Sequence, residues 1–379
     1  MHVKGRPSAR PTPRRRRRRV RLRRSLIPRL GRAVAWAGVL LALAWVMGVI
    51  LNDRTPWSQY LWWIPAPAVA VATWAAFGFS QLADAVSSRL SGTVARPFVL
   101  LGALAATFTI VAGWHPLRAL GSGPQLRVED AQIVYWNAAW SVPTGARDRL
   151  DALEPDVLIV ANPRPSSTTR ELHDWMRSRA IAWREEAGTE RATHLVRLRQ
   201  IVIISRWPIT ASGVARLGAG AAGGSVVSRA TQNGIGFAVI ERSEGPALRL
   251  HVVDLPSDPT WHRRDMLEEV RRTRDAWRGQ EAEGQLARFP EADVLIGDFN
   301  TPRGSESLEI LTMGLNESHA AVGTGSPRTF PLPLPCWAID LAHVGRNWRP
   351  ITADTRGLGV GFHKAITVRV RPAGVAARR

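Results

Sequence analysis

The chain has 379 residues, of which 45% are hydrophobic and 22% charged, so it can bury a core and is not disordered throughout. Its formal charge of +20 is concentrated at one end: residues 1–32 carry 13 Arg and Lys4 without any acid, and residues 118–379 carry only +5. The single cysteine, Cys336, excludes an internal disulfide and any zinc site built from cysteines.

Three apolar stretches follow the basic tail of residues 1–32. Residues 33–51, 60–79 and 97–114 contain 19, 20 and 18 residues without a charge, and Trp residues lie towards their ends. Each stretch is long enough to cross a hydrocarbon layer of ~30 Å, and Trp favours the membrane–water interface. We therefore predict that residues 33–117 form three transmembrane helices rather than buried core helices.

The charge of the tail predicts which way the chain faces. An excess of Arg and Lys before the first span holds the N-terminus in the cytoplasm. Three crossings then place everything after Trp114 outside, so we expect an integral protein of the inner or plasma membrane with an extracytoplasmic C-terminal domain. The alternative is that the tail binds nucleic acid, although membrane topology and anionic lipid already explain a basic segment beside a span.

We predict that residues 118–125, with the sequence Gly-Ser-Gly-Pro at positions 121–124, form a linker. After it, the residue pattern changes from long apolar runs to short ones. Short runs rich in Val and Ile predict strands at residues 126–136, 156–161, 195–205, 235–241, 247–253, 293–296, 338–344 and 365–370. Residues 144–153, 167–179 and 260–277 have helical patterns. This mixture favours α+β layers, and the Gly/Ala run 218–224 favours a surface loop over a phosphate-binding loop.

One motif stands out within this region. An apolar strand ends in Ile296-Gly297-Asp298-Phe299-Asn300, which places a carboxylate and an amide on one side of the chain. Such a pair can provide a base or ligand next to a neutral hydrogen-bond donor. The alternative is a turn in which Asp298 and Asn300 cap a helix over residues 301–311.

Other motifs extend this pattern along the chain. In order they are Tyr135-Trp136-Asn137, Glu154-Pro155-Asp156, Ser205-Arg206-Trp207-Pro208, Val253-Asp254-Leu255-Pro256, Arg263, Thr329-Phe330-Pro331, Ile339-Asp340 and Phe362-His363. The series, over residues 126–371, resembles the endonuclease/exonuclease/phosphatase family. With three spans before the domain, the chain looks like the membrane-anchored bacterial subgroup, part of which acts on lipid-linked pyrophosphate. Residues 372–379 are a tail.

The resemblance implies a four-layer α/β/β/α sandwich that cleaves phosphoesters with a metal ion. By motif position, Asp298 matches the residue that orients or deprotonates the attacking water, and Asn300 matches the amide that stabilises the transition state. Asp340 matches the carboxylate that orients a histidine, and His363 matches that histidine, which contacts the scissile phosphate. Asn137 matches the amide that organises metal and phosphate. Phosphoryl transfer depends mainly on such positioning and charge stabilisation.

The chain also departs from the family pattern. Asn162 stands where the family has a Glu metal ligand, Phe362 where it has an Asp, and Asp254 where it has a His. We expect Asn162 and Asp254 to line the pocket of a Mg²⁺ or Mn²⁺ ion, with less negative charge than usual. The alternative to a hydrolase is therefore a non-catalytic module that binds a phosphate-bearing ligand on the same fold.

Two arginines and two histidines complete the candidates. Arg206 and Arg263 are candidates for phosphate contact, with a solvated surface charge as the alternative. His194 lies in a Thr-His-Leu sequence at the wrong place in the motif order, and His251 is expected to be a strand residue. For the substrate, the membrane layout favours a lipid-linked pyrophosphate over DNA or RNA, and an endonuclease is the remaining alternative.

Overall fold

The computed structural model describes residues 13–87, 94–121, 123–139, 142–163, 166–188, 192–217, 234–279, 286, 288–359 and 361–374. The run 218–224 lies outside these residues. Contacts divide the chain into two units, Met1–Ile50 with Ile64–Ile110 and Leu51–Trp63 with Val111–Arg379. The short connection between the first two predicted spans therefore groups with the C-terminal domain.

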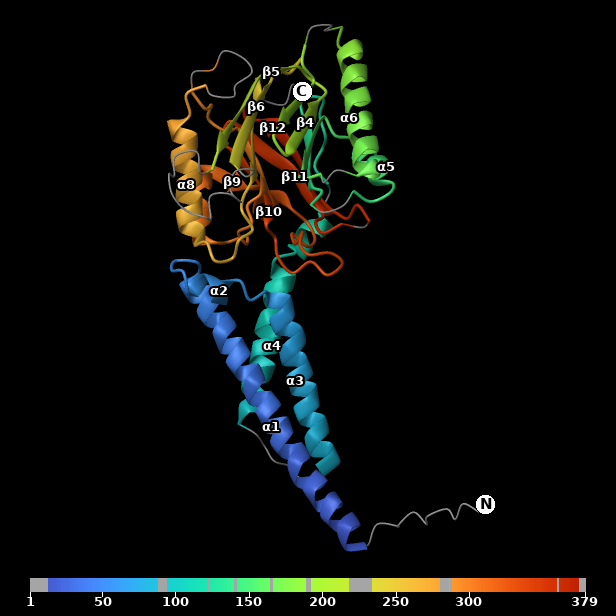
Figure 1. The fold of residues 1–379 in the computed structure, drawn as a ribbon, viewed down its shortest axis with the longest axis vertical. Helices are drawn as coiled ribbons and strands as arrows, with labels where there is room; N and C mark the ends of the chain where they lie inside the picture. Colours follow the sequence, from blue (N-terminus) through green and yellow to red (C-terminus); the bar gives the residue numbers. More distant parts are fainter. Residues whose placement is uncertain are drawn as a thin grey trace, which may run out of the picture. The chain divides into compact units, whose positions relative to one another are not determined.

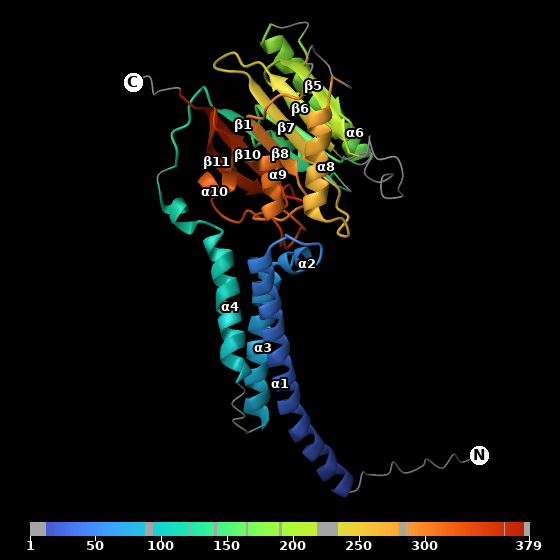
Figure 2. The ribbon, with the colours of Figure 1, turned by 90° about the vertical axis from the view of Figure 1, so that its left-hand side faces the viewer.

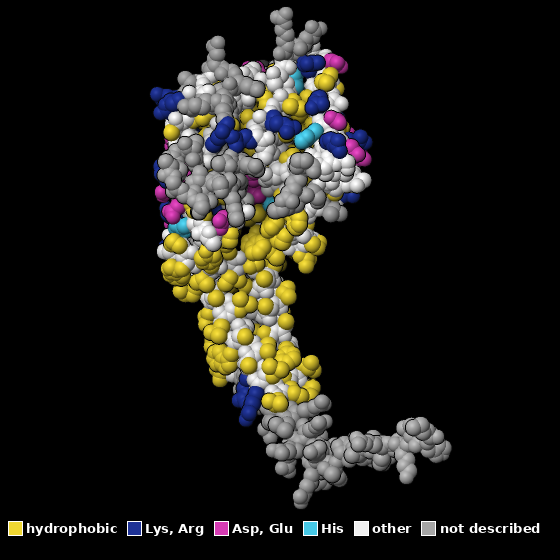
Figure 3. Space-filling model, viewed as in Figure 1, with side chains coloured by type: hydrophobic (Ala, Val, Ile, Leu, Met, Phe, Trp, Pro, Cys, Tyr) yellow, Lys and Arg dark blue, Asp and Glu magenta, His cyan; other side chains and the backbone are white. Residues whose placement is uncertain are grey.

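The first unit contains the helices α1 (Pro13–Leu51), α3 (Ala66–Ser87) and α4 (Ala95–Ala112). Within them, Leu26–Leu51, Ala66–Val86 and Ala95–Ala112 are long and apolar enough to cross a membrane. On the face that Figure 3 shows, hydrophobic side chains are abundant along these helices. The second helix begins at Ala66 and not at the predicted residue 60, because Pro65 and Pro67 suit a helix start and not a helix interior.

Small residues bring these helices close together. A Cβ added at Gly102 would lie 2.7 Å from the Cβ of Ala42, and one at Gly38 would lie 3.1 Å from that of Ala76. Ala35, Val99 and their neighbours are buried in the same cluster. Helices in lipid associate through close packing of small side chains, so these glycines are placed where the helix contact needs them.

The second unit contains two six-stranded sheets. The first sheet has the spatial order β11 (Trp348–Arg356), β12 (Ala365–Pro372), β1 (Ala131–Asn137), β2 (Val157–Ala161), β4 (Ile201–Ser205) and β3 (Leu195–Leu198). The second has the order β5 (Ile209–Arg216), β6 (Gly234–Ile240), β7 (Leu248–Asp254), β8 (Val294–Asp298), β10 (Asp340–Gly345) and β9 (Leu315–Glu317).

Helices cover the outer faces of both sheets (Figures 1 and 2). On the first sheet, α5 (Ala146–Asp151) and α6 (Ser167–Glu186) pack in a buried cluster with strand residues such as Val134 and Leu158. On the second, α8 (Arg263–Ala276) packs against Phe237 and its neighbours. The shorter helices are α2 (Ser58–Trp62), η1 (Pro116–Leu120), η2 (Glu306–Leu308), α9 (Glu309–Thr312) and α10 (Ser318–Val322). The layer order confirms the predicted α/β/β/α sandwich preceded by three long apolar helices.

Local sequence patterns predicted most, but not all, of these elements. Residues 195–205, predicted as one strand, form the hairpin of β3 and β4, because the chain turns at Arg199 with a φ of +60°. Strands β5, β9 and β11 were not predicted. Several residues of β11 are half-buried or exposed, and polar residues alternate with apolar ones only in part, so the run lacks a strong strand signal.

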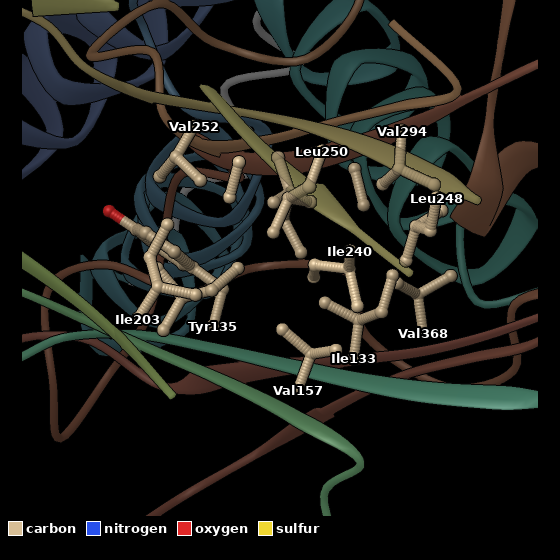
Figure 4. Close-up of a cluster of buried hydrophobic side chains, with 14 of the residues drawn as sticks. Ile133, Tyr135, Val157, Ile203, Ile240, Leu248, Leu250, Val252, Val294 and Val368 are labelled. Atoms are coloured by element: carbon tan, nitrogen blue, oxygen red, sulfur yellow. The ribbon is translucent and has the colours of Figure 1, made fainter. Parts of the chain in front are cut away.

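The inner faces of the two sheets form the central core. Ile133, Tyr135 and Val157 from the first sheet pack against Leu250 and Val294 from the second (Figure 4). These side chains belong to the alternating positions of their strands that point between the sheets. Tyr135 is the polar member of the cluster, and its hydroxyl lies at the end of the core where the site begins.

The strand residue His251 predicts acid sensitivity. It is 3% exposed and bonds the Pro290 carbonyl at 2.9 Å, and burial beside Arg274 lowers its pKa to about 3. The folded state therefore disfavours the imidazolium. The contribution of neutral His251 to the free energy of unfolding is complete above pH 6.5 and decreases as the pH falls towards 3. Lowering the pH from 6.5 to 4.5 should therefore reduce the free energy of unfolding by ~2–3 kcal/mol through this residue.

Chemical unfolding of the full chain in detergent, followed by Trp fluorescence, tests this prediction. The variant His251→Phe keeps a ring in the cluster of Phe289 and Trp277. Its free energy of unfolding should decrease by ~2–3 kcal/mol less than that of the unsubstituted chain between pH 6.5 and 4.5. An equal decrease in both proteins would contradict the prediction.

Candidate active site

Polar side chains lie at the ends of four strands, on one side of the two sheets. In the first sheet Asn137 pairs with Ala161 between β1 and β2. In the second, Asp298 pairs with Asp254 on the parallel strand β7 and with Asp340 on the antiparallel strand β10. The register therefore brings three carboxylates from separate motifs to neighbouring positions. All of them are 3% exposed or less.

Gly297 allows this close register. Its φ is +149°, a backbone conformation open to glycine but not to other residues. A Cβ at this position would overlap the carbonyl oxygen of Val253 on the adjacent strand. The residue before Asp298 must therefore be glycine for β8 to run beside β7 up to the site.

The carboxylate of Asp298 is held from both sides. Its Oδ2 accepts a hydrogen bond of 2.8 Å from the Asn137 amide, and its Oδ1 accepts one of 2.8 Å from the backbone N–H of Asn300. The Asp298 N–H donates to the Tyr135 hydroxyl at 3.0 Å. These bonds join the two sheets at the site and fix the direction of the carboxylate.

His363 and Asp340 form a buried pair. Nδ1 of His363 lies 2.8 Å from Oδ2 of Asp340, and the histidine is 5% exposed. The ring of Phe330 packs on the imidazole with its centroid at 4.7 Å. With Nδ1 donating to the Asp340 carboxylate, Nε2 is the ring nitrogen left for another partner.

The electrostatics of the site follow from burial and from like charges. Burial, together with the nearby Asp340, raises the pKa of Asp298 well above its ordinary value. Burial also raises the pKa of Asp254 to about 7, although Asn162 and Gln200 donate hydrogen bonds to it. Burial acts to lower the pKa of His363, but the Asp340 carboxylate outweighs it and raises the pKa to about 9. His363 is therefore an imidazolium at neutral pH.

A metal ion fits the chemistry of this cluster. Asp298, Asp340 and His363 each offer one ligand atom, and these atoms lie within 4.8 Å of one another. Oδ1 of Asp340 is buried without a hydrogen-bond partner among the described residues. Clustered carboxylates with a free buried oxygen match the hard oxygen ligands that Mg²⁺ and Mn²⁺ prefer. The residues present thus suit a divalent cation.

The two predicted metal ligands lie beside this group. The side chain of Asn162 donates to Asn137 Oδ1 at 3.3 Å and also bonds the Asp254 carboxylate. Gln200 donates to the same carboxylate. Asn162 and Asp254 therefore share the cluster, connected to Asp298 through Asn137, and their role as ligands stays a prediction.

The structure brings Asn300 into the site but separates the two arginines. The Asn300 amide donates to the Leu255 carbonyl at 2.7 Å, which leaves its second N–H for a ligand. Arg206 follows β4 at the opposite edge of the first sheet, half-exposed beside Asp156 and Glu186. Arg263 is 1% exposed and donates to the backbone carbonyls of Pro256 and Asp258, so it stabilises the loop that follows Asp254.

The two predicted structural histidines have structural partners. His194 bonds the Ser205 carbonyl at 3.0 Å, at the same edge as Arg206 and away from Asn137. His251 is a residue of β7, as predicted.

Sequence reasoning missed two residues of the site. Tyr135 lies two positions before Asn137 on the same strand, so the alternation of side chains could have placed it beside Asp298. Gln200 lies in the tight turn between β3 and β4 and reaches Asp254 from there. No local pattern marks this glutamine, because only the pairing of the two sheets brings the turn to the site.

Comparison with known proteins finds similar solved structures. No protein-family model matches the chain, and no curated protein matches it either. An endonuclease/exonuclease/phosphatase from Beutenbergia cavernae DSM 12333 matches with a TM-score of 0.42 and 15% identity, over 65% of this chain and 73% of that one. That structure is one of the solved structures to which this chain is similar.

Two further matches have stated activities or ligands of their own. Sphingomyelinase C from Streptomyces griseocarneus has a TM-score of 0.41 and 13% identity, over 63% of this chain and 99% of its own. A beta toxin variant from Staphylococcus aureus with bound magnesium ions has a TM-score of 0.42 and 12% identity, over 63% and 99%. Each describes a protein that this chain is similar to in fold.

Proposed function

We propose that this protein is a metal-dependent hydrolase of phosphoesters or phosphoanhydrides. The observation that carries the proposal is the group of Asp298, Asp340 and His363, with ligand atoms within 4.8 Å of one another at a buried sheet edge. A carboxylate that can take a proton thus lies next to an imidazolium that can bind phosphate oxygen. This pairing suits attack of water on phosphorus.

The side chains divide the reaction between them. Asp298, fixed by Asn137 and by the Asn300 N–H, orients the attacking water and accepts its proton. His363, oriented by Asp340, donates from Nε2 to a non-bridging phosphate oxygen. The free amide N–H of Asn300 stabilises the charge that develops there. The new P–O bond forms from water as the bond from phosphorus to the leaving oxygen breaks.

A divalent cation completes the charge balance of the site. Carboxylate oxygens of Asp298 and Asp340 would hold it, with Asn162 and Asp254 as the further ligands that the motifs predict. When bound, Mg²⁺ or Mn²⁺ supplies positive charge to the phosphate oxygens and lowers the pKa of neighbouring carboxyl groups. This would offset the elevated pKa of Asp298, which burial keeps well above its ordinary value.

The proposed substrate is a lipid-linked pyrophosphate, and the proposed location of the domain is outside the cytoplasm. Support comes from three candidate spans and from the basic residues 1–32 before the first of them. A phosphatase reporter that requires export, fused after Arg118, should be active. If this reporter is inactive and a reporter that works only in the cytoplasm is active at the same fusion point, the placement is wrong. That result would favour a nuclease guided by the tail.

A hydrolysis assay on the full chain in detergent tests the activity. We expect turnover of a generic phosphodiester or pyrophosphate diester with Mg²⁺ or Mn²⁺, and its loss on chelation with return on adding metal. A lipid pyrophosphate in nanodiscs should be cleaved with a higher kcat/KM than the soluble compounds. The full chain is used because Leu51–Trp63 groups with the domain.

The competing function is a non-catalytic receptor. It is favoured because Asn162 and Phe362 stand where the family that the motifs resemble has acidic residues. Measurable binding of a phosphate-bearing compound without metal-stimulated turnover would support the receptor and contradict the hydrolase. Turnover that depends on Asp298 would exclude it.

A further inference from the structure

The segment Leu51–Trp63 is built into the C-terminal domain through buried polar contacts. It connects α1 and α3 along the chain, and its members Asp53 and Gln59 are 0% and 1% exposed. A short connection exposed to solvent would have no reason to bury two polar side chains. Their burial requires partners, and the domain supplies them.

The segment holds the loop that follows β8 through residues near both of its ends. Asn52 Oδ1 accepts from the Glu306 N–H at 3.0 Å, and Asp53 Oδ1 accepts from the Ser307 N–H at 3.2 Å. The N-cap residue Ser305 makes no capping bond of its own, and its hydroxyl accepts from Trp62 Nε1 at 2.7 Å. The segment thus caps η2, a few residues after Asn300, from a distant part of the chain.

The segment also holds the loop that follows β7, through Arg263. Gln59 Oε1 accepts from the backbone N–H of Arg263 at 3.1 Å, and the Trp63 ring centroid lies 4.9 Å from its guanidinium. That guanidinium donates to the carbonyls of Pro256 at 2.7 Å and Asp258 at 2.9 Å. Arg263 therefore fixes the backbone that leaves the site just after Asp254.

Both supported loops lead directly to groups of the site. Leu255 lies between Asp254 and Pro256, its carbonyl accepts from the Asn300 amide, and its N–H donates to the Asp298 carbonyl at 2.9 Å. The chain that carries Asn300 continues to the residues that Asn52 and Asp53 cap. The segment thus lies behind the two loops that set the position of Asn300 and the direction of Asp298.

We propose that Leu51–Trp63 is a positioning element of the active site, with Gln59 and Trp63 acting through Arg263. The inference rests on the proposed hydrolase function, since positioning is measured as turnover. Its proposed role is to act through other residues and not by touching the substrate. An error of about 1 Å in a catalytic group can reduce the rate by a factor of about 10². Loss of these supports should therefore reduce kcat more than substrate binding.

Four variants of the full chain in detergent test the proposal. Gln59→Ala removes the acceptor of the Arg263 N–H, and Trp63→Ala removes the ring over its guanidinium, whereas Trp63→Phe keeps an aromatic face. Trp57→Ala is the matched control, because Trp57 belongs to the same segment but is 58% exposed. We expect kcat to fall about tenfold or more in the two first variants, with KM within about twofold. Trp63→Phe should retain most of the kcat, and Trp57→Ala all of it.

Either of two kinetic results would overturn the proposal. The first is an unchanged kcat in Gln59→Ala and Trp63→Ala. The second is a loss in Trp63→Phe as large as in Trp63→Ala, which would show that general destabilisation and not the ring over Arg263 is responsible.

Hydrogen exchange separates a failure of this inference from a failure of the proposed function. If the unsubstituted chain shows no turnover, the hydrolase is wrong, and exchange of residues 256–263 by mass spectrometry decides on the segment alone. Faster exchange in Gln59→Ala than in Trp57→Ala supports the contact through the Arg263 amide. Equal exchange in the two variants overturns it.

Discussion

Replacing Asp298 with asparagine is expected to reduce kcat by a factor of about 10³, because general-base groups contribute factors of about 10²–10⁴. Asparagine has the same shape but cannot accept the proton of the attacking water. Thermal stability should change little, since the substitution removes a buried carboxyl group whose pKa burial and Asp340 raise but also loses one of the two hydrogen bonds that its oxygens accept. The measurements are kcat with saturating Mg²⁺ or Mn²⁺ and the melting temperature of the full chain.

Asp293→Asn provides the control for this substitution. Asp293 is also buried, at 1% exposed, and precedes the same strand at its other end, where it pairs with Arg249 at 2.8 Å. Its substitution should lower the melting temperature and leave kcat within about twofold. A kcat that falls equally in both variants would show that the loss reflects stability and not the chemistry assigned to Asp298.

Replacing Gly297 with alanine is expected to destabilise the domain by more than about 4 kcal/mol, the range reserved for severe steric and backbone conflicts. The new Cβ would overlap the Val253 carbonyl oxygen, and the φ of +149° disfavours any side chain. Because Gly297 lies in the central strands of its sheet, β8 cannot move away without breaking the pairing with both β7 and β10. The yield of folded protein and the midpoint of denaturant unfolding report the effect.

Gly314→Ala separates the effect of a positive φ on stability from the effect of the steric overlap at Gly297. Gly314 also has a positive φ, of +81°, but the nearest atom to an added Cβ is the flexible end of Arg346 at 3.9 Å. This substitution should cost only about 1–2 kcal/mol, the usual price of a left-handed conformation. Equal stability of the two variants would contradict the steric role of Gly297.

The candidate site was predictable to the extent that its residues lie at strand ends. Asp298 follows a run that local pattern marks as a strand, His363 precedes such a run, and Asp340 lies near the start of another. Arg206 follows a strand at its other end, beside Asp156 and Glu186, because a strand has two ends and a charge does not say which of them faces the site. Gln200 had no signal, since a turn reveals its neighbours only after the sheets have paired.

The three long apolar helices show the same division. Charge-free runs predicted three spans, and three helices of suitable length and hydropathy are present. The predicted start of the second was wrong, because hydropathy continued through Trp62 and Trp63 while Pro65 and Pro67 interrupted the helix. The contacts of residues 51–63 had no local signal, since their partners, such as Glu306 for Asn52, lie 254 positions away.

By itself, the sequence determined the basic tail, three membrane-length apolar runs and an α+β domain. These properties depend on residues close together in the chain, where hydropathy, charge and backbone freedom act directly. The tertiary structure alone decided that Arg263 is a buried support, that Arg206 faces away, and that Leu51–Trp63 belongs to the domain. Burial and hydrogen bonding between distant segments arise only when sheet edges and loops meet, so no local pattern can encode them.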